Sequence, residues 1–230
     1  MAASAVPAPT IVGRRIGNEH EPIVIVDDFA PDPAALRDFA AERTFGVPVT
    51  AYPGIRAPAP RTYLDAARPI LATIFGQAFG LTGAARVIDL CFAIVTTPRE
   101  RLTLEQRIPH IDGAEPGRVA MVHFLSEADH GGTAFFRHRS TGFETIGPDR
   151  TAAYYATLDR EVRRDGPPPA DYIRGSTAQF ECLCEVVAKP NRAVFYRSAL
   201  LHSGVIPPDL PLSPDPRVGR LTITGFFAAR

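Results

Sequence analysis

From residue 85 onward, apolar and polar residues alternate with a period of two in eight short runs, which polar or Pro- and Gly-rich turns separate. The runs are ARVIDLCFAIVTT, LEQRIPHID, RVAMVHFLS, GTAFFRHRS, QFECLCEVVA, NRAVFYRS, LHSGVI and GRLTITGFFAA. This period places alternate side chains on opposite faces of a strand. Many short strands joined by turns are typical of antiparallel folds with closed or facing sheets. The pattern therefore predicts a mainly β fold with flanking helices (α+β) and a double-stranded β-helix core, the jelly-roll or cupin-like architecture.

The part of the chain before residue 85 has helical periodicity instead. Residues 32–45 form a candidate helix with Asp32 as the N-cap and Pro33 at the first helical position, where proline is well tolerated. Residues 64–81 form a second amphipathic candidate, and residues 21–29 have the composition of a short buried strand. This front part is therefore expected to support the β core.

We expect one domain behind a short tail. Residues 1–10 form the flexible tail, and residues 11–230 form the single domain. Within it, residues 11–84 are the helical support region and residues 85–230 are the jelly-roll core, with a helical insert near 149–163.

Composition excludes several functional classes. Lys+Arg and Asp+Glu number 25 each, so no excess positive charge favours a nucleic-acid partner. No stretch of about 18 apolar residues is present, so we expect no membrane span. The N-terminus lacks the apolar core of a signal peptide. Three cysteines, an odd number, argue against a disulfide framework and favour a reducing, cytoplasmic location. We expect a monomer or a homodimer.

The segment RIPHIDG contains a histidine and an aspartate two residues apart, His110 and Asp112. On a strand both side chains point to one face, which brings two types of metal ligand together. Taken alone, the segment is better explained as a polar pair on the wet face of an ordinary strand. A third ligand would come from His202, which follows an apolar strand and a short turn and opens another strand. His123, on an apolar strand face, is expected to be a hydrogen-bonded core residue.

The segment GRLTI places Arg220 and Thr222 on one strand face. A guanidinium and a hydroxyl arranged in this way can hold a carboxylate, with two parallel hydrogen bonds from the arginine and a third from the threonine. Alone, Arg-x-Thr is an ordinary surface pattern. In order after His-x-Asp and a distant histidine, it fits an anchor for the far end of a dicarboxylate.

The ordered set His110-x-Asp112, His202 and Arg220-x-Thr222, with GGTAFF in between, resembles the iron(II)- and 2-oxoglutarate-dependent dioxygenases, most closely their prolyl-hydroxylase-like branch. VIVDDFAPDPAALRDFA and YPGIRAP add a similarity to bacterial members of unknown substrate, and the resemblance covers residues 22–229. A Pro-rich insertion at 207–216 and a long insert at 143–179 depart from the family pattern.

The resemblance implies a role for each of these residues. His110, Asp112 and His202 would hold Fe(II), and Arg220 with Thr222 would bind the distal carboxylate of 2-oxoglutarate. The implied reaction consumes O2 and 2-oxoglutarate, hydroxylates an unactivated C–H bond and releases succinate and CO2. Because relatives that halogenate lack the ligand carboxylate, the presence of Asp112 favours hydroxylation.

Two other classes stay open: a cupin-type metalloenzyme that does not use 2-oxoglutarate, and a non-catalytic binding barrel. The substrate is weakly constrained. Candidate residues at the mouth of the barrel are Tyr52, Arg56, Arg61, Arg137 and Arg139. Arginines of this kind are often simply solvated surface residues. If they line the mouth, they favour an amino acid, a peptide side chain or a small acidic metabolite as the substrate.

Overall fold

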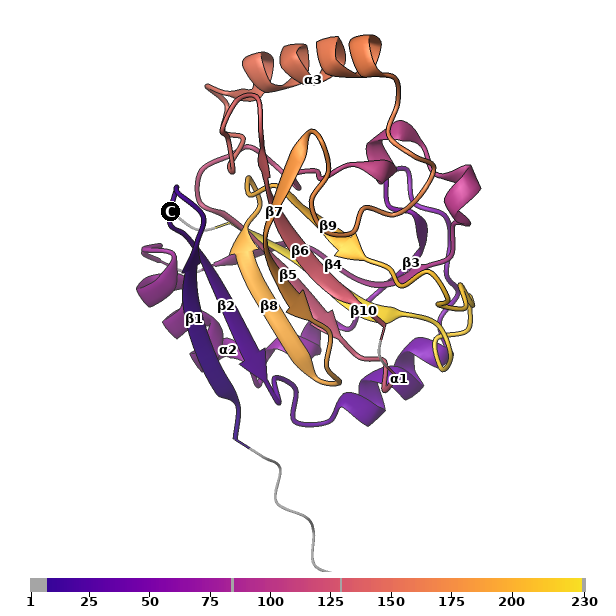
Figure 1. Ribbon diagram of the computed structural model, residues 1–230. Coiled ribbons are helices and arrows are strands. Elements are labelled where there is room, and N and C mark those ends of the chain that lie inside the picture. The colour runs from indigo at the N-terminus through magenta and orange to yellow at the C-terminus, as the bar shows by residue number, and fades with distance from the viewer. Residues whose placement is uncertain (1–7, 84, 129, 229–230) are drawn as a thin grey trace, which may run out of the picture.

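Two antiparallel β-sheets form the centre of the molecule (Figure 1). The computed structural model describes residues 8–83, 85–128 and 130–228. The larger sheet has seven strands in the order β1 (Thr10–Ile16), β2 (Glu21–Asp27), β8 (Arg192–Arg197), β5 (Arg118–Phe124), β10 (Leu221–Ala228), β4 (Arg86–Val95) and β3 (Gly54–Pro58). The smaller sheet has three strands in the order β7 (Phe180–Val187), β6 (Gly132–His138) and β9 (His202–Val205). The predicted mainly β fold is confirmed, and the two antiparallel sheets fit a jelly roll.

Helices cover the outer faces of both sheets. The helical elements are α1 (Pro33–Ala41), η1 (Arg61–Leu64), α2 (Arg68–Thr73), the π-helical turn η2 (Ile74–Ala78), η3 (Arg99–Arg101), η4 (Leu104–Arg107) and α3 (Thr151–Asp165). The first four of these pack on the large sheet, against alternate residues such as Phe92 and Ile223. Helix α3, at the top of Figure 1, packs on the small sheet through Tyr154 and Leu158.

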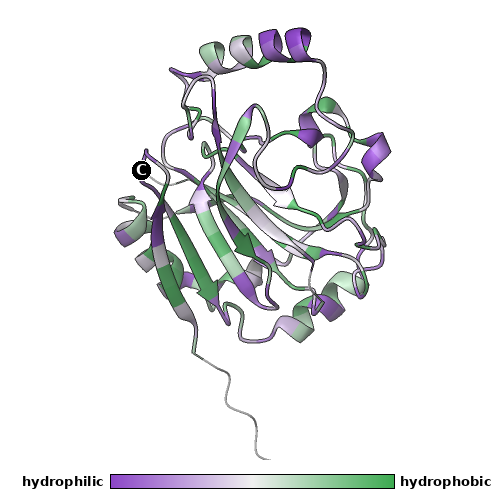
Figure 2. Ribbon diagram, viewed as in Figure 1, coloured by the Kyte–Doolittle hydropathy of each residue, from purple (hydrophilic) through white to green (hydrophobic). Residues whose placement is uncertain are grey.

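The remaining residues of the strands point into the space between the two sheets. Tyr196 and Phe124 of the large sheet meet Phe135 and Val186 of the small sheet there in one buried cluster. Figure 2 shows the strands as largely hydrophobic, whereas the C-terminal end of α3 is hydrophilic. The alternation with a period of two therefore separates an outer core under the helices from an interior between the sheets.

The helix expected at residues 32–45 begins where predicted and ends earlier. The Asp32 side chain accepts the backbone N–H of Ala35 at 2.9 Å, and Pro33 opens the helix. Helix α1 ends at Ala41 because the following chain is needed elsewhere: Gly46 exchanges two backbone hydrogen bonds with Arg56 of β3. A tertiary strand pairing therefore overrides the helical propensity of residues 42–45.

The second expected helix, residues 64–81, is shorter and is broken into pieces. Pro69 lies in the first turn of α2, as its missing N–H and rigid ring require, so α2 begins only at Arg68. After Thr73 the chain continues as the π turn η2. Gly80, with φ of 66°, follows the end of this turn.

Two sequence expectations need correction. The front region, residues 11–84, is not only helical, since it contributes β1, β2 and β3 to the large sheet. The run at 104–112 is not a strand: its first part is the 3₁₀ turn η4, capped reciprocally by Thr103 and Gln106. Pro109 has no N–H to donate to a ladder. Within this run, the described structure has one isolated β-bridge, between His110 and His202.

The Pro-rich segment 207–216 joins β9 to β10 and lies on the surface. Its leucines turn inward into a small apolar cluster, which we call the cap. The cap consists of Tyr52, Val95, Leu102, Tyr172, Ile206, Leu210 and Leu212. No helix in the described part of the chain is both long and apolar enough to cross a membrane.

Candidate metal and co-substrate site

His110 and His202 are paired directly across two antiparallel segments. Each donates its backbone N–H to the carbonyl of the other at 2.9 Å. Residues paired in this way present their side chains on the same side, and the two ring centroids lie 4.4 Å apart. The predicted convergence of the two histidines is therefore present, although it comes from one bridge and not from a full strand.

Asp112 completes a three-residue group. Its backbone N–H donates to the carbonyl of Ser198 at 2.8 Å, which fixes the loop after the bridge. Its carboxylate lies 3.2 Å from Nε2 of His202 and 3.9 Å from Nε2 of His110. One ligand atom from each of the three residues lies within 4.8 Å of the other two. Two imidazoles and one carboxylate form the donor set typical of non-haem Fe(II) oxygenases.

The surroundings prepare these groups as ligands. The carbonyl of Leu200 lies 2.8 Å from Nδ1 of His202; with the proton on Nδ1, Nε2 is left as the ligand atom. Burial alone would lower the pKa of His202, but Asp112 outweighs it and the pKa is raised. Burial would raise the pKa of Asp112, but the neighbouring His202 holds it below its usual range.

His110 differs from His202 in its exposure. His202 is buried, whereas half of the His110 side chain reaches solvent. Desolvation by the surrounding protein, followed by the charge of His202, nevertheless lowers the pKa of His110 to about 4. His110 is therefore neutral near pH 7, the form that binds metals, and marks the open side of the group.

Arg220 is a buried cation without an acidic partner. It is 5% exposed, and it donates from Nε to the carbonyl of His130 at 2.9 Å and from Nη2 to that of Gly132 at 2.8 Å. No carboxylate in the described residues forms an ion pair with it. Burial lowers its pKa, and the ionisable side chains nearest to it are tyrosines, which are neutral near pH 7. A buried charge left in this way is costly unless a ligand meets it.

Thr222 and Tyr52 lie beside Arg220. Thr222 is 1% exposed and donates to the carbonyl of Ala93 at 3.2 Å. The Tyr52 hydroxyl is buried without a well-formed hydrogen bond among the described residues, although the Thr222 hydroxyl lies beside it. Burial raises the pKa of Tyr52 to about 12, against the opposing charges of Arg220 and Arg56. The interior therefore holds an unpaired cation next to an unsatisfied hydroxyl, as a pocket for a carboxylate would.

Tyr196 connects this pocket to the metal group. Its ring centroid lies 4.6 Å from that of His202. Burial raises its pKa, and Asp112 and Arg220 both act on it. Neither Tyr196 nor Tyr172, which approaches Arg220 from the cap, was singled out by the sequence. Strand alternation predicts that Tyr196 faces the interior, but nothing in its own segment links it to the distant histidines.

The residues present therefore fit Fe(II) and 2-oxoglutarate together. The group of His110, Asp112 and His202 supplies the donor set for the metal. The unpaired Arg220 and the unsatisfied hydroxyl of Tyr52 supply the complement to a distal carboxylate.

Arg56 is the predicted mouth residue that the structure places on the inner face of the large sheet. It pairs with Ala93, which also pairs with Thr222. Its Nη2 donates to Asp89 at 2.9 Å and to Thr224 at 2.7 Å, while its Nε is buried without a partner among the described residues. Arg56 is therefore only partly satisfied by the protein.

The other predicted mouth arginines are placed differently. Arg137 is held by two carboxylates, at 2.8 Å from Nε to the fully buried Glu144 and at 2.8 Å from Nη1 to Glu181, so its guanidinium already has acidic partners in the protein. Arg139 donates to the carbonyl of Thr177 at 3.1 Å. Arg61 opens η1, and its side chain lies outside the described part of the structure.

His123 is confirmed as a hydrogen-bonded core residue. Its Nδ1 lies 2.8 Å from the hydroxyl of Tyr63 and its Nε2 lies 3.0 Å from Oδ1 of Asn191. Burial lowers its pKa to about 4. It lies on the outer, helix-covered face of β5, away from the space between the sheets.

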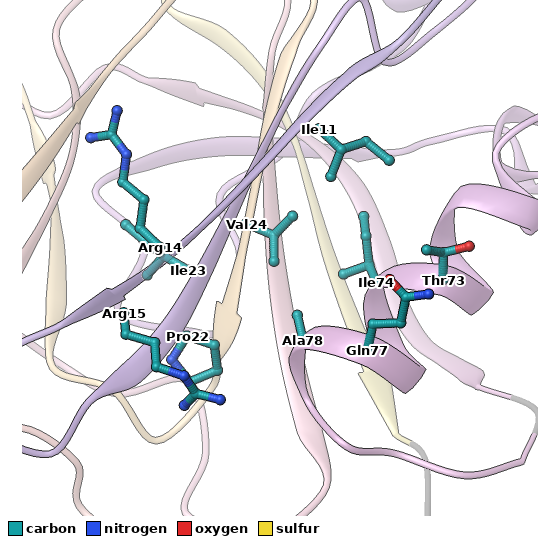
Figure 3. A pocket seen from close by; sticks show the side chains of 11 residues that line it. Ile11, Arg14, Arg15, Pro22, Ile23, Val24, Thr73, Ile74, Gln77 and Ala78 are labelled. Atoms are coloured by element: carbon teal, nitrogen blue, oxygen red, sulfur yellow. The ribbon is translucent and has the colours of Figure 1, made fainter.

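A hollow lies away from these residues, beside the edge strand β1. It has a volume of about 340 Å³, and Figure 3 shows Ile11, Val24, Ile74 and Ala78 around it. Its lining contains Arg14 and Arg15 but no histidine, cysteine, aspartate or glutamate among the described residues. This hollow therefore lacks the metal-ligand types that the interior between the sheets contains.

Comparison with solved structures defines the class of fold. The crystal structure of HygX from Streptomyces hygroscopicus with nickel and 2-oxoglutarate bound is similar, with a TM-score of 0.51 over 90% of this chain and 82% of that chain, at 12% identity. The non-haem α-ketoglutarate-dependent epimerase SnoN from nogalamycin biosynthesis is also similar, with a TM-score of 0.51 over 92% of this chain and 79% of that chain, at 12% identity. The chain therefore shares the fold of 2-oxoglutarate-dependent enzymes.

The particular family follows from the sequence. Residues 7–227 match the model of a family of unknown function, DUF6445, and the chain belongs to that family. A comparison with the sequences of functionally curated proteins gave no match. The family name carries no activity, so the function must be argued from the site.

Proposed function

We propose that this protein is an Fe(II)- and 2-oxoglutarate-dependent oxygenase of the prolyl-hydroxylase-like branch. It hydroxylates an unactivated C–H bond of an amino acid, a peptide side chain or a small acidic metabolite, and it releases succinate and CO2. The observation that carries the proposal is Arg220, a buried guanidinium without a carboxylate partner in the described residues, in the same interior as the His-Asp-His group. The shared fold with HygX and SnoN supports it.

His110, Asp112 and His202 would hold the iron. With O2 and 2-oxoglutarate, bound iron supplies the oxidising power that breaks the C–H bond. The carbonyl of Leu200 orients the His202 ring, and the Ser198 carbonyl holds the loop that carries Asp112. These contacts keep three ligands on one side of the site and leave the opposite side open.

Arg220, Thr222 and Tyr52 would hold the distal carboxylate of 2-oxoglutarate. The backbone carbonyls of His130 and Gly132 fix the Arg220 guanidinium before any ligand arrives, so little side-chain entropy is lost on binding. The apolar cap, with Leu210 and Leu212 of the Pro-rich segment, excludes water from this end. Exclusion of water strengthens the ion pair between the guanidinium and the carboxylate.

The open side of the site faces the substrate. We assign the exposed edge of His110 and the partly satisfied Arg56 to this open side. Arg137 and Arg139 are held by protein groups and are not assigned to the substrate.

The test is a titration of the anaerobic Fe(II) protein with 2-oxoglutarate, followed by the metal-to-ligand absorption band. We expect the band to appear when 2-oxoglutarate is added to the wild-type protein. In Arg220→Ala, a higher concentration of 2-oxoglutarate should be needed to produce it. Iron binding without such a band would favour the cupin-type metalloenzyme that does not use 2-oxoglutarate. A band without succinate formation for any substrate would favour a non-catalytic binding barrel.

A further inference from the structure

Arg118 is a cation near the metal-binding group that the sequence did not single out. It opens β5 and pairs with Ala228 of β10, two positions along each strand from the pair formed by Ala120 and Phe226. Alternation therefore places Arg118 on the inner face of the large sheet. Its guanidinium carbon lies 5.7 Å from the centroid of the Phe226 ring.

Arg118 also approaches the loop that carries Asp112. A methyl group placed on Gly113, the residue after Asp112, would lie 2.8 Å from Nη1 of Arg118. The backbone carbonyl of Arg118 accepts the N–H of Ser198, whose own carbonyl accepts that of Asp112. The arginine is therefore linked to the metal group through its backbone, and its guanidinium lies close to Gly113, next to Asp112.

The hydrogen-bonding capacity of Arg118 is not used up. Its Nε is buried and donates to no acceptor in the described part of the chain. Its Nη1 pairs with Glu115 at 3.2 Å, but that carboxylate is 69% exposed, and ion pairs so close to solvent contribute little. A buried donor without an acceptor is uncommon in proteins and calls for an explanation.

The surroundings of Arg118 are partly open. Phe226, Thr224 and Val122, which share its face of the sheet, are half-buried, whereas Thr222 and Phe124 further along the same face are buried. In the metal group, the His110 side chain is likewise half exposed. A ligand that enters there meets an apolar ring, Phe226, beside a guanidinium with a free donor.

We infer that Arg118 binds a carboxylate of the substrate while Phe226 packs against its apolar part. This assignment rests on the proposed function and narrows it to substrates that carry a free carboxylate, such as an amino acid or a small acidic metabolite. A guanidinium makes paired hydrogen bonds with a carboxylate through Nε and one Nη. The orphaned Nε of Arg118 is the donor that such a pair requires.

A structural role is the competing explanation. In that case Arg118 acts only through Glu115, and the ion pair stiffens the loop between Asp112 and β5. The two explanations differ in the expected effect of Glu115→Gln. Loss of the ion pair should weaken the site if Arg118 merely tethers the loop. It should leave carboxylate binding unchanged or tighter if Arg118 is the anion site, because a competing carboxylate has been removed.

The experiment uses the anaerobic Fe(II)·2-oxoglutarate complex and a library of matched pairs, each a carboxylic acid and its primary amide. Binding is read from the shift of the metal-to-ligand absorption band. The variants are Arg118→Gln, Arg118→Lys and Glu115→Gln. The control is Arg163→Gln, which breaks an exposed ion pair of similar type to Asp159 on α3. Iron content is measured for each variant.

We expect acids to bind about 10- to 100-fold more tightly than their amides in the wild-type protein. Arg118→Gln should remove this preference, Arg118→Lys should restore part of it, and Glu115→Gln and Arg163→Gln should keep it, all with normal iron content. The inference is overturned if the wild-type protein binds no acid more tightly than the matching amide. It is also overturned if Arg118→Gln keeps the preference for acids, or if Glu115→Gln loses this preference as well. Absence of the band before any acid is added would instead refute the proposed function, and the inference with it.

Discussion

Two clusters in this molecule combine histidine with a carboxylate, and they differ in what their nitrogen atoms face. His138, fully buried, is satisfied on both sides of its ring: Nδ1 lies 2.9 Å from the hydroxyl of Thr141 and Nε2 lies 2.9 Å from Glu161. Ser140 also donates to the Glu161 carboxylate. This cluster fastens α3 to the small sheet and has no free ligand atom to offer.

The second cluster is built the opposite way. His202 has the carbonyl of Leu200 on Nδ1, and its Nε2 lies 3.2 Å from the carboxylate of Asp112. Its Nε2 and that of His110 both point toward the carboxylate of Asp112, and the His110 side chain is half exposed. Residue types alone do not separate the two clusters. The difference lies in convergence: one cluster is closed by protein donors, and the other gathers three ligand atoms around a point.

The largest effect should follow from removal of a ligand. We expect His110→Ala or His202→Ala to abolish tight Fe(II) binding, a loss beyond the roughly 100-fold that removal of a partner behind a metal ligand causes. His138→Ala is the matched control and should bind iron as the wild-type protein does. Isothermal titration of the anaerobic apoprotein with Fe(II) measures this. Normal iron affinity in both ligand variants would remove the distinction between the clusters.

Removal of the buried arginine should come next. Arg220→Ala should weaken 2-oxoglutarate binding by about 2–4 kcal/mol, or roughly 30- to 1000-fold, because the distal carboxylate would be left unpaired. Arg220→Lys should recover only part, since an ammonium cannot make the paired contact. Iron affinity should not change.

The matched control for Arg220 is Arg137, whose guanidinium is already held by Glu144 and Glu181. Arg137→Ala should leave 2-oxoglutarate affinity intact when the absorption band is titrated. An equal loss of 2-oxoglutarate affinity in Arg220→Ala and Arg137→Ala would contradict a specific role of Arg220 in binding 2-oxoglutarate.

Most strand positions and the candidate ligands could be predicted from the sequence, the strands from local alternation and the candidate ligands from the order of their motifs. The alternation with a period of two located β4 to β10 to within a few residues. The order of His110, Asp112, His202 and Arg220 matched a known arrangement. The run at 104–112 was assigned to a strand wrongly, because the capping of η4 by Thr103 and Gln106 competes with extended structure.

The rest of the site depends on contacts between distant segments. Tyr52 lies in the loop before β3. No local pattern in the sequence shows that its hydroxyl reaches the neighbourhood of Arg220 and Thr222. The sequence around Arg118 also gives no sign of a role in the site, since RVAMVHF has the pattern of an ordinary strand. The contact between Arg137 and Glu144 is of the same kind, because Glu144 meets Arg137 only after the turn that follows β6.

A smaller effect is expected from the closed histidine cluster, and it concerns stability instead of binding. His138→Ala should lower the free energy of unfolding by about 2 kcal/mol, because it leaves the buried Glu161 without one of its partners. Urea denaturation measures the change. Iron affinity should stay at the wild-type value, which is the reverse of the pattern expected for His202→Ala. A His138→Ala protein that loses iron without losing stability would contradict the comparison.

The smallest effect should come from the unsatisfied hydroxyl of Tyr52, and its sign separates a binding role from a structural one. In the protein alone this buried hydroxyl lacks a well-formed hydrogen bond among the described residues, so Tyr52→Phe should leave the free energy of unfolding unchanged or raise it slightly. The same variant should weaken 2-oxoglutarate by about 1 kcal/mol, or roughly fivefold, because one hydrogen bond to the carboxylate is lost. Thr222→Val is the matched variant: its hydroxyl already donates to the Ala93 carbonyl, so both stability and 2-oxoglutarate affinity should fall. Urea denaturation and titration of the absorption band, performed on both variants, give the two signs. If Tyr52→Phe destabilises the fold and leaves 2-oxoglutarate affinity unchanged, Tyr52 belongs to the cap alone and the distal carboxylate is held by Arg220 and Thr222 without it.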